Sequence, residues 1–128
     1  MKSSLLAGLV GLLLVAALVH LGGCSTIDTL GKIQAAGASV RQAATPLLDA
    51  RCEAAAKLCP QGKAADCAGL MKCWTTRRAF YAATDAVQAF VAGGLAALAA
   101  GEDGKTWVAK ATASIQALLR FATKEGLL

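Results

Sequence analysis

Residues 51–73, RCEAAAKLCPQGKAADCAGLMKC, hold four of the five cysteines of this 128-residue chain. Six, seven and five residues separate Cys52, Cys59, Cys67 and Cys73 in turn. An even number of cysteines at this density favours two disulfides. Zinc and free thiols are the alternatives, and zinc is disfavoured because its ligands usually come as close CxxC pairs, which this stretch lacks. Two internal crosslinks are therefore expected to fix this part of the fold.

Helical geometry selects one of the three possible pairings. Cys52 and Cys59, seven apart, share one face of a helix, and the later pair, six apart, lies on roughly one side of the next helix. Pro60-Gln61-Gly62 favours a chain reversal between them. The expected disulfides are Cys59–Cys67 near the turn and Cys52–Cys73 farther out. This nested arrangement resembles the doubly stapled helical hairpins of twin-cysteine proteins.

Helical periodicity runs through the rest of the chain, and no segment alternates convincingly enough to predict a strand. Thr26 can cap a first helix, whose apolar pattern continues past Thr45-Pro46. Proline there either starts a second helix or bends one long helix. The pattern then predicts a long helix that ends near Gly101 and a last amphipathic helix to about Lys124. The predicted fold class is all-α, a small three- to four-helix bundle with a disulfide-stapled helical hairpin.

The chain opens with MKSSLLAGLVGLLLVAALVHLGGC. Lys2 precedes an uncharged stretch of residues 5–19, which is too short to span a bilayer comfortably, and small residues follow it. This order is typical of a secretory signal. The closing Leu21-Gly22-Gly23-Cys24 resembles the lipobox of bacterial lipoproteins, in which an aliphatic residue and two small ones precede a cysteine. An ordinary signal peptide with an incidental cysteine, or a short membrane anchor, is the alternative.

The resemblance implies that a signal peptide of residues 1–23 is removed and that Cys24 is acylated, becoming the N-terminus of a single domain of residues 24–128. Ser25 follows in place of Asp, which by the sorting pattern of enteric lipoproteins implies the outer membrane. The resemblance thus implies a membrane as the partner. The N-terminal lipid would hold the protein to it, with the domain facing the periplasm. Export also accounts for the remaining cysteines, because disulfides form in oxidising compartments.

Removal of residues 1–23 takes away His20, the only histidine, and leaves 12 basic against 8 acidic side chains. A Ser/His/Asp or Cys/His nucleophile would then have no imidazole. Carboxylate pairs could form among Asp49, Glu53, Asp66 and Asp85. The i,i+4 spacing of Asp49 and Glu53 around Arg51, however, is more typical of a solvated helix face. The sequence therefore predicts no catalytic residues, no metal site and no cofactor.

Residues 99–106, AAGEDGKT, match a degenerate form of the sequence motif of a phosphate-binding loop. Such a loop follows a strand, whereas the preceding AFVAGGLAALAA is predicted to be helical. Glu102 and Asp103 would also place negative charge where a polyphosphate must lie. The segment is therefore interpreted as a turn in which Gly101 ends one helix and a residue near Thr106 begins the next.

A basic and aromatic cluster begins next to the last cysteine of the second pair, Cys73: Lys72, Trp74, Arg77, Arg78 and Tyr81. Trp, Tyr and Arg are enriched in binding hot spots, so the cluster is a candidate surface for an envelope protein or an anionic glycolipid. The alternative, which the spacing favours, is that Trp74 and Tyr81, seven apart, belong to the core while the arginines are solvated. Nucleic acid is not expected as a partner, because the net charge is modest and the protein is predicted to be exported to the cell envelope, away from nucleic acid.

The uncharged stretch 86–101 is apolar enough to associate with a bilayer but too short to span one, and burial in the bundle is expected. Together these patterns predict a non-catalytic envelope lipoprotein that acts as a binding or structural module. A membrane-active or phage-exclusion lipoprotein encoded by a mobile element is the alternative. An enzyme is a third hypothesis, which a deep cleft lined by carboxylates would favour.

Overall fold

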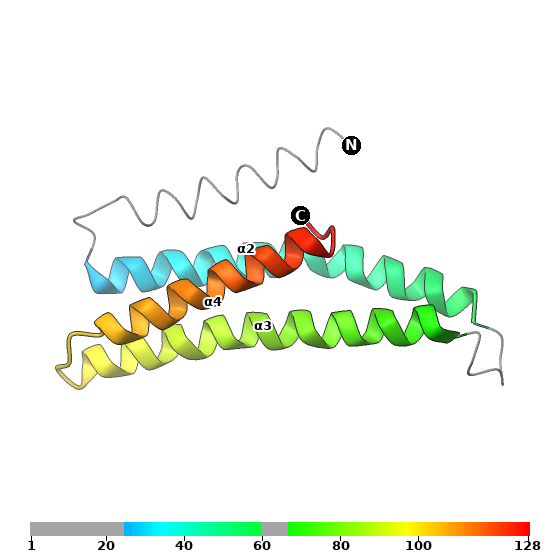
Figure 1. Ribbon diagram of the computed structural model, residues 1–128. Coiled ribbons are helices and arrows are strands. Elements are labelled where there is room, and N and C mark those ends of the chain that lie inside the picture. The colour runs from blue at the N-terminus through cyan, green and yellow to red at the C-terminus, as the bar shows by residue number, and fades with distance from the viewer. Residues whose placement is uncertain (1–24, 60–66) are drawn as a thin grey trace.

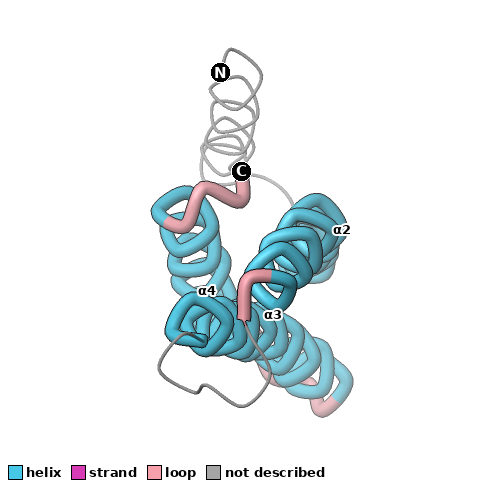
Figure 2. The backbone as a smooth tube through the Cα atoms, turned by 90° about the vertical axis from the view of Figure 1, so that its right-hand side faces the viewer, coloured by secondary structure: helices cyan, strands magenta, loops and turns pink. Residues whose placement is uncertain are grey.

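The computed structural model describes residues 25–59 and 67–128 of the chain. Three helices make up this part: α2 (Thr26–Lys57), α3 (Ala68–Ala99) and α4 (Lys105–Lys124). Figure 1 shows α2 and α3 running antiparallel along the molecule, with α4 lying against both. Figure 2 shows that the described residues are helical almost throughout, with short loops at the helix ends. The prediction of a small all-α bundle is confirmed.

Helix α2 begins at Thr26. Its N-cap is Ser25 rather than the predicted Thr26: the Ser25 hydroxyl oxygen accepts a hydrogen bond of 3.2 Å from the backbone N–H of Asp28. The helix continues through Pro46 for 32 residues, so proline lies within one long helix. Pro46 and Gln42, whose carbonyl loses its helical donor, are both exposed, so water can replace that hydrogen bond.

The turn between α3 and α4 forms as the sequence predicts. Gly101 and Gly104 both have positive φ, at 83° and 72°, which residues with a Cβ rarely adopt. The N–H of Glu102 donates to the carbonyl of Ala97 at 2.9 Å, closing the end of α3. Helix α4 then begins at Lys105. Because a helix and not a strand precedes this segment, its geometry differs from that of a phosphate-binding loop.

The core follows the line along which the three helices meet. Its largest fully buried side chains are Leu30, Ile33, Leu48, Phe80, Thr84, Val87, Val91, Ile115, Leu118 and Leu127. Phe80, not its neighbour Tyr81, occupies the core position on α3. On the cysteine side of Leu48 and Phe80, Cys52 is the one buried residue among those described. The apolar core therefore stops well before the cysteine-bearing ends of α2 and α3.

The C-terminal residues mark where the third helix ends. Arg51 of α2 donates hydrogen bonds to the carbonyl oxygens of Glu125 and Gly126, at 2.5 and 2.7 Å. Leu127 packs into the core beside them. These contacts fix the end of α4 to α2 at the level of Arg51, and Figure 1 shows α2 and α3 continuing past that level.

Beyond α4, the ends of α2 and α3 form an arm that two disulfides hold together. We define the arm as residues 52–59 and 67–76. The predicted pairing is confirmed: the Cα atoms of Cys52 and Cys73 are 5.5 Å apart, and those of Cys59 and Cys67 are 4.9 Å apart. In the loop-entropy account, a crosslink across 21 residues contributes about 3 kcal/mol. The predicted turn at Pro60-Gln61-Gly62 and the signal peptide lie outside the described residues.

At the opposite end, a glycine lets all three helices converge. A Cβ added to Gly94 of α3 would lie 2.7 Å from Leu30 Cδ1 of α2 and 3.1 Å from Trp107 Cβ of α4. Atoms at these distances overlap, and a Cβ attached to another helix backbone cannot rotate away. The close approach of the helices here therefore depends on the missing side chain.

We expect Gly94→Ala to lower the free energy of unfolding by about 1–3 kcal/mol, because overpacking outweighs the better helix propensity of alanine. Gly31→Ala on α2 is the matched control, since a Cβ there meets nothing within 4 Å. That substitution should raise the free energy by about 0.5–1 kcal/mol. Urea unfolding followed by circular dichroism measures both, and equal effects would contradict the packing described here.

Candidate functional site

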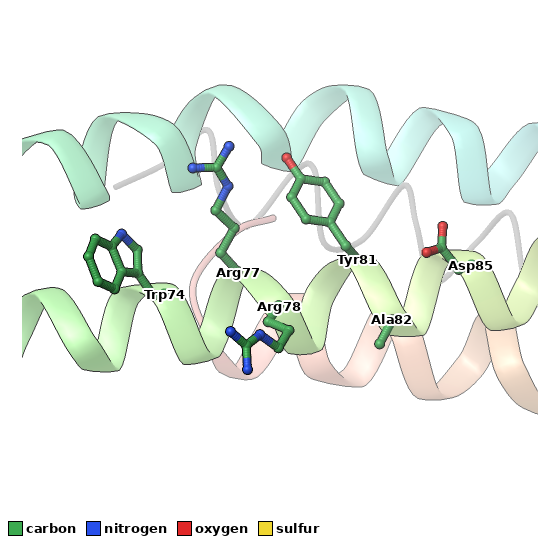
Figure 3. Close-up of a pocket in the computed structure, with 6 residues that line it drawn as sticks. All are labelled: Trp74, Arg77, Arg78, Tyr81, Ala82 and Asp85. Atoms are coloured by element: carbon green, nitrogen blue, oxygen red, sulfur yellow. The ribbon is translucent and has the colours of Figure 1, made fainter.

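Four of the five residues of the predicted basic and aromatic cluster line one surface pocket. The pocket has a volume of about 480 Å³ and is lined by Trp74, Arg77, Arg78, Tyr81, Ala82 and Asp85. Figure 3 shows Arg77 and Tyr81 reaching from α3 toward α2, while Arg78 points away from α2. Lys72 does not join them, because residues two apart lie on opposite sides of a helix.

Tyr81 lies between two arginines that come from different helices. The guanidinium carbon of Arg41 on α2 is 5.0 Å from the centre of the Tyr81 ring, and that of Arg77 on α3 is 5.8 Å from it. Each arginine also contacts a carboxylate on the facing helix, Arg41 with Asp85 at 3.4 Å and Arg77 with Asp49 at 3.1 Å. The five side chains form a row of alternating partners across the α2–α3 contact.

This row matches the register that the disulfides set, and it adds little to the stability of the helix pair. Its charged groups are partly exposed, and exposed ion pairs and cation–π contacts each contribute about 0–1 kcal/mol. A shift of α2 along α3 by one turn would break all of these contacts together. Sequence analysis missed Arg41 and Asp85 as partners, because they become neighbours only once the register of the hairpin is known.

Trp74 is exposed, so the sequence-based preference for placing it in the core is wrong. Half of its surface, 50%, is open to solvent, and 56% of Met71, one turn earlier, is open as well. The physical reason is its place around α3: Trp74 is about 120° from the buried Phe80, so it lies outside the side of the helix that the core covers. Tyr81 is half-buried at the edge of the core. Large apolar side chains are therefore presented to solvent beside the pocket.

The charges of the pocket leave one basic group unmatched. Asp49 and Asp85 are both occupied by arginines, whereas Arg78 is exposed and makes no ion pair with any residue that the structure describes. Asp49 and Glu53 do not pair with each other, since Glu53 binds Lys57 at 2.9 Å. The pocket therefore suits an anionic group attached to an apolar body.

Metal-ligating side chains do not gather anywhere in residues 25–59 and 67–128: no group of three His, Cys, Asp or Glu side chains is placed to hold an ion. No protein-family model, curated protein or solved structure matches the chain. Function must therefore be inferred from the geometry and the sequence motifs alone.

Helix α3 is the one described helix that is long and apolar enough to cross a membrane, judged by length and composition. Only 28% of its most apolar 18-residue window is buried. The expected burial of residues 86–101 is thus correct for one side of the helix, where Val87 and Val91 lie in the core. On the other side Leu95 and the alanines near it are exposed. This half of α3 presents an uncharged surface to solvent.

Trp74→Ala should change the free energy of unfolding by less than about 0.5 kcal/mol, because the side chain has no core contacts to lose. Phe80→Ala, six residues later on the same helix, should cost about 3–5 kcal/mol. Chemical denaturation of the two variants gives the comparison. A loss of several kcal/mol in Trp74→Ala would show that the indole is buried after all.

Proposed function

We propose that the chain is a bacterial envelope lipoprotein, held at the membrane by lipid on Cys24, which acts as a non-catalytic binding or structural module. The observation that carries this proposal is the pair of disulfides, at Cys52–Cys73 and Cys59–Cys67. Disulfides of this kind persist in exported proteins and are rare in the reducing cytosol. The signal and lipobox pattern of residues 1–24 then accounts for the export and for the fifth cysteine.

The start of α2 supports an anchor at residue 24. Since Ser25 is the helix cap, no linker separates the folded domain from the proposed acylated residue. Two or three acyl chains hold a protein firmly, because each buried methylene contributes about 0.8 kcal/mol. The domain would therefore sit directly at the bilayer surface, with the outer membrane as the proposed location because Ser25 is not Asp.

The pocket beside Trp74 is the proposed contact surface, with an envelope protein or an anionic glycolipid as its partner. Catalysis is not part of the proposal, since Asp85 of the pocket and the nearby Asp49 are engaged by arginines and the lone histidine lies in the segment proposed to be removed.

A membrane-active or phage-exclusion lipoprotein encoded by a mobile element is the second candidate function. The exposed, uncharged surface of α3 favours it, because a helix buried in a bundle core would hide most of its apolar window. A lysis or phage gene beside the coding sequence would distinguish this function from that of a resident envelope component.

Cys24→Ala should abolish acylation and leave an unprocessed precursor that globomycin no longer affects. Radiolabelled palmitate incorporation and mass spectrometry of the N-terminal peptide measure this. Ser25→Asp is the matched variant: aspartate caps a helix as well as serine does, so the fold is kept while the proposed sorting residue changes. In an enteric host it should move the protein to the inner membrane. An unlipidated Cys24 in the native protein would end the proposal.

A further inference from the structure

Most of the large apolar side chains that the described residues expose lie along one side of the α2–α3 pair. Six such side chains are exposed: Ile27, Leu47, Leu58, Met71, Trp74 and Leu95. Trp74 is one heptad before Tyr81, and Leu95 is two heptads after it. Met71 is one heptad before Arg78. Positions one heptad apart differ by only about 20° around a helix. Around α3, Trp74 and Leu95 therefore lie within about 40° of Tyr81, and Met71 lies within about 80° of it.

The fourth of these exposed apolar side chains, Ile27, belongs to α2 and lies on the side of that helix next to the pocket. Ile27 is two heptads before Arg41, whose guanidinium meets Tyr81 of α3, and 59% of Ile27 is exposed. We call this surface the seam face and define it by Ile27, Met71, Trp74, Tyr81 and Leu95. From Trp74 to Leu95 it extends about 32 Å, at 1.5 Å per residue. It thus runs from the arm to the end of the bundle where α2 begins.

The seam face is turned away from α4. Helix α4 covers α3 through Trp107, whose ring lies against Gly93. Gly93 is twelve residues after Tyr81, which places the two about 120° apart around α3. In Figure 3, Arg77 and Tyr81 extend from α3 toward α2, whereas the ribbon of α4 lies on the other side of α3. Nothing in the described part of the chain covers this face.

Most charged side chains on the seam face form ion pairs, and one arginine has no ion pair with any described residue. Its two carboxylates, Asp49 and Asp85, are held by Arg77 and Arg41. Arg78 is left over, next to Trp74. Exposed tryptophan with a neighbouring arginine is typical of a protein surface at the boundary between lipid and water, where the ring is partly apolar and the cation meets phosphate.

We propose that the seam face lies flat on the anionic bilayer that holds the lipid anchor. This rests on the proposed acylation of Cys24, which fixes the Ile27 end of the face at the membrane because α2 starts one residue after the cap. A tethered surface meets the bilayer at high effective concentration, so a modest apolar face suffices to hold it down. The long axis of the bundle is then parallel to the membrane, and the arm contacts lipid through Trp74.

The two tryptophans of the chain distinguish a flat from an upright bundle. Trp107 lies near the anchored end of the bundle but away from the seam face, whereas Trp74 lies at the far end on the seam face. An upright bundle brings Trp107 closer to lipid, and a flat bundle brings Trp74 closer. The order of lipid contact is therefore reversed between the two orientations.

The experiment uses the lipidated full chain in vesicles of phosphatidylethanolamine and phosphatidylglycerol with brominated acyl chains, which quench tryptophan fluorescence. Trp107→Phe leaves Trp74 as the only reporter, and Trp74→Phe leaves Trp107. We expect Trp74 to lose most of its emission and Trp107 to keep most of its own. If Trp107→Phe does not fold, the quenching of Trp74 is obtained as the difference between the quenching of the unaltered chain and that of Trp74→Phe.

Matched variants test the face itself. Leu95→Glu and Arg78→Glu should restore the emission of Trp74, because each puts negative charge against anionic lipid. Leu47→Glu and Arg120→Glu are the controls: Leu47 is two residues from Asp49 and so on the opposite side of α2, and Arg120 is an exposed residue of α4. Neither control should change the quenching.

Vesicle flotation in the same samples separates failure of this proposal from failure of the proposed function. Flotation with stronger quenching of Trp107 than of Trp74 would overturn the flat orientation and leave the lipid anchor intact. Absence of flotation would overturn both. Flotation without quenching of either tryptophan, together with a dimer in light scattering that Leu95→Glu dissociates, would assign the face to a second copy of the chain.

Discussion

The disulfide between Cys52 and Cys73 closes the part of the molecule that has no core. Helix α4 stops at the level of Arg51, and no large apolar side chain is buried past that level in the described residues. Two helices alone cannot cover an apolar stripe as three do, so the arm would separate without a covalent link. The inner disulfide, Cys59–Cys67, then closes the arm near its end.

The same link sets the register on which the candidate site depends. With Cys52 opposite Cys73, Asp49 falls opposite Arg77 and Arg41 falls opposite Asp85, so the row of charges around Tyr81 follows from the crosslink. Trp74 is open to solvent because it lies on the side of α3 that faces away from α4. The proposed binding surface depends on this placement.

The sequence was sufficient to predict the fold class, both disulfides, the turn at residues 99–106 and the end of the last helix. Those features depend on local chemistry: cysteine spacing, glycine at positive φ and helical periodicity. It was not sufficient to place Trp74, because periodicity gives the side of a helix but not whether another helix covers it. The partners of Arg41 and Asp85 were missed for a related reason, since they are 44 residues apart and meet only through the hairpin register.

Hydrogen–deuterium exchange of a variant that lacks the outer disulfide, Cys52→Ser with Cys73→Ser, tests most directly whether that crosslink substitutes for a third helix. We expect amides of residues 52–59 and 67–76 to lose their protection while those around Ile115 and Leu118 keep theirs, because the three-helix part has its own core. Retained protection in the arm would show that packing holds it without the crosslink. Loss of protection throughout the chain would show that the core and the arm are one cooperative unit, and either result would contradict the account.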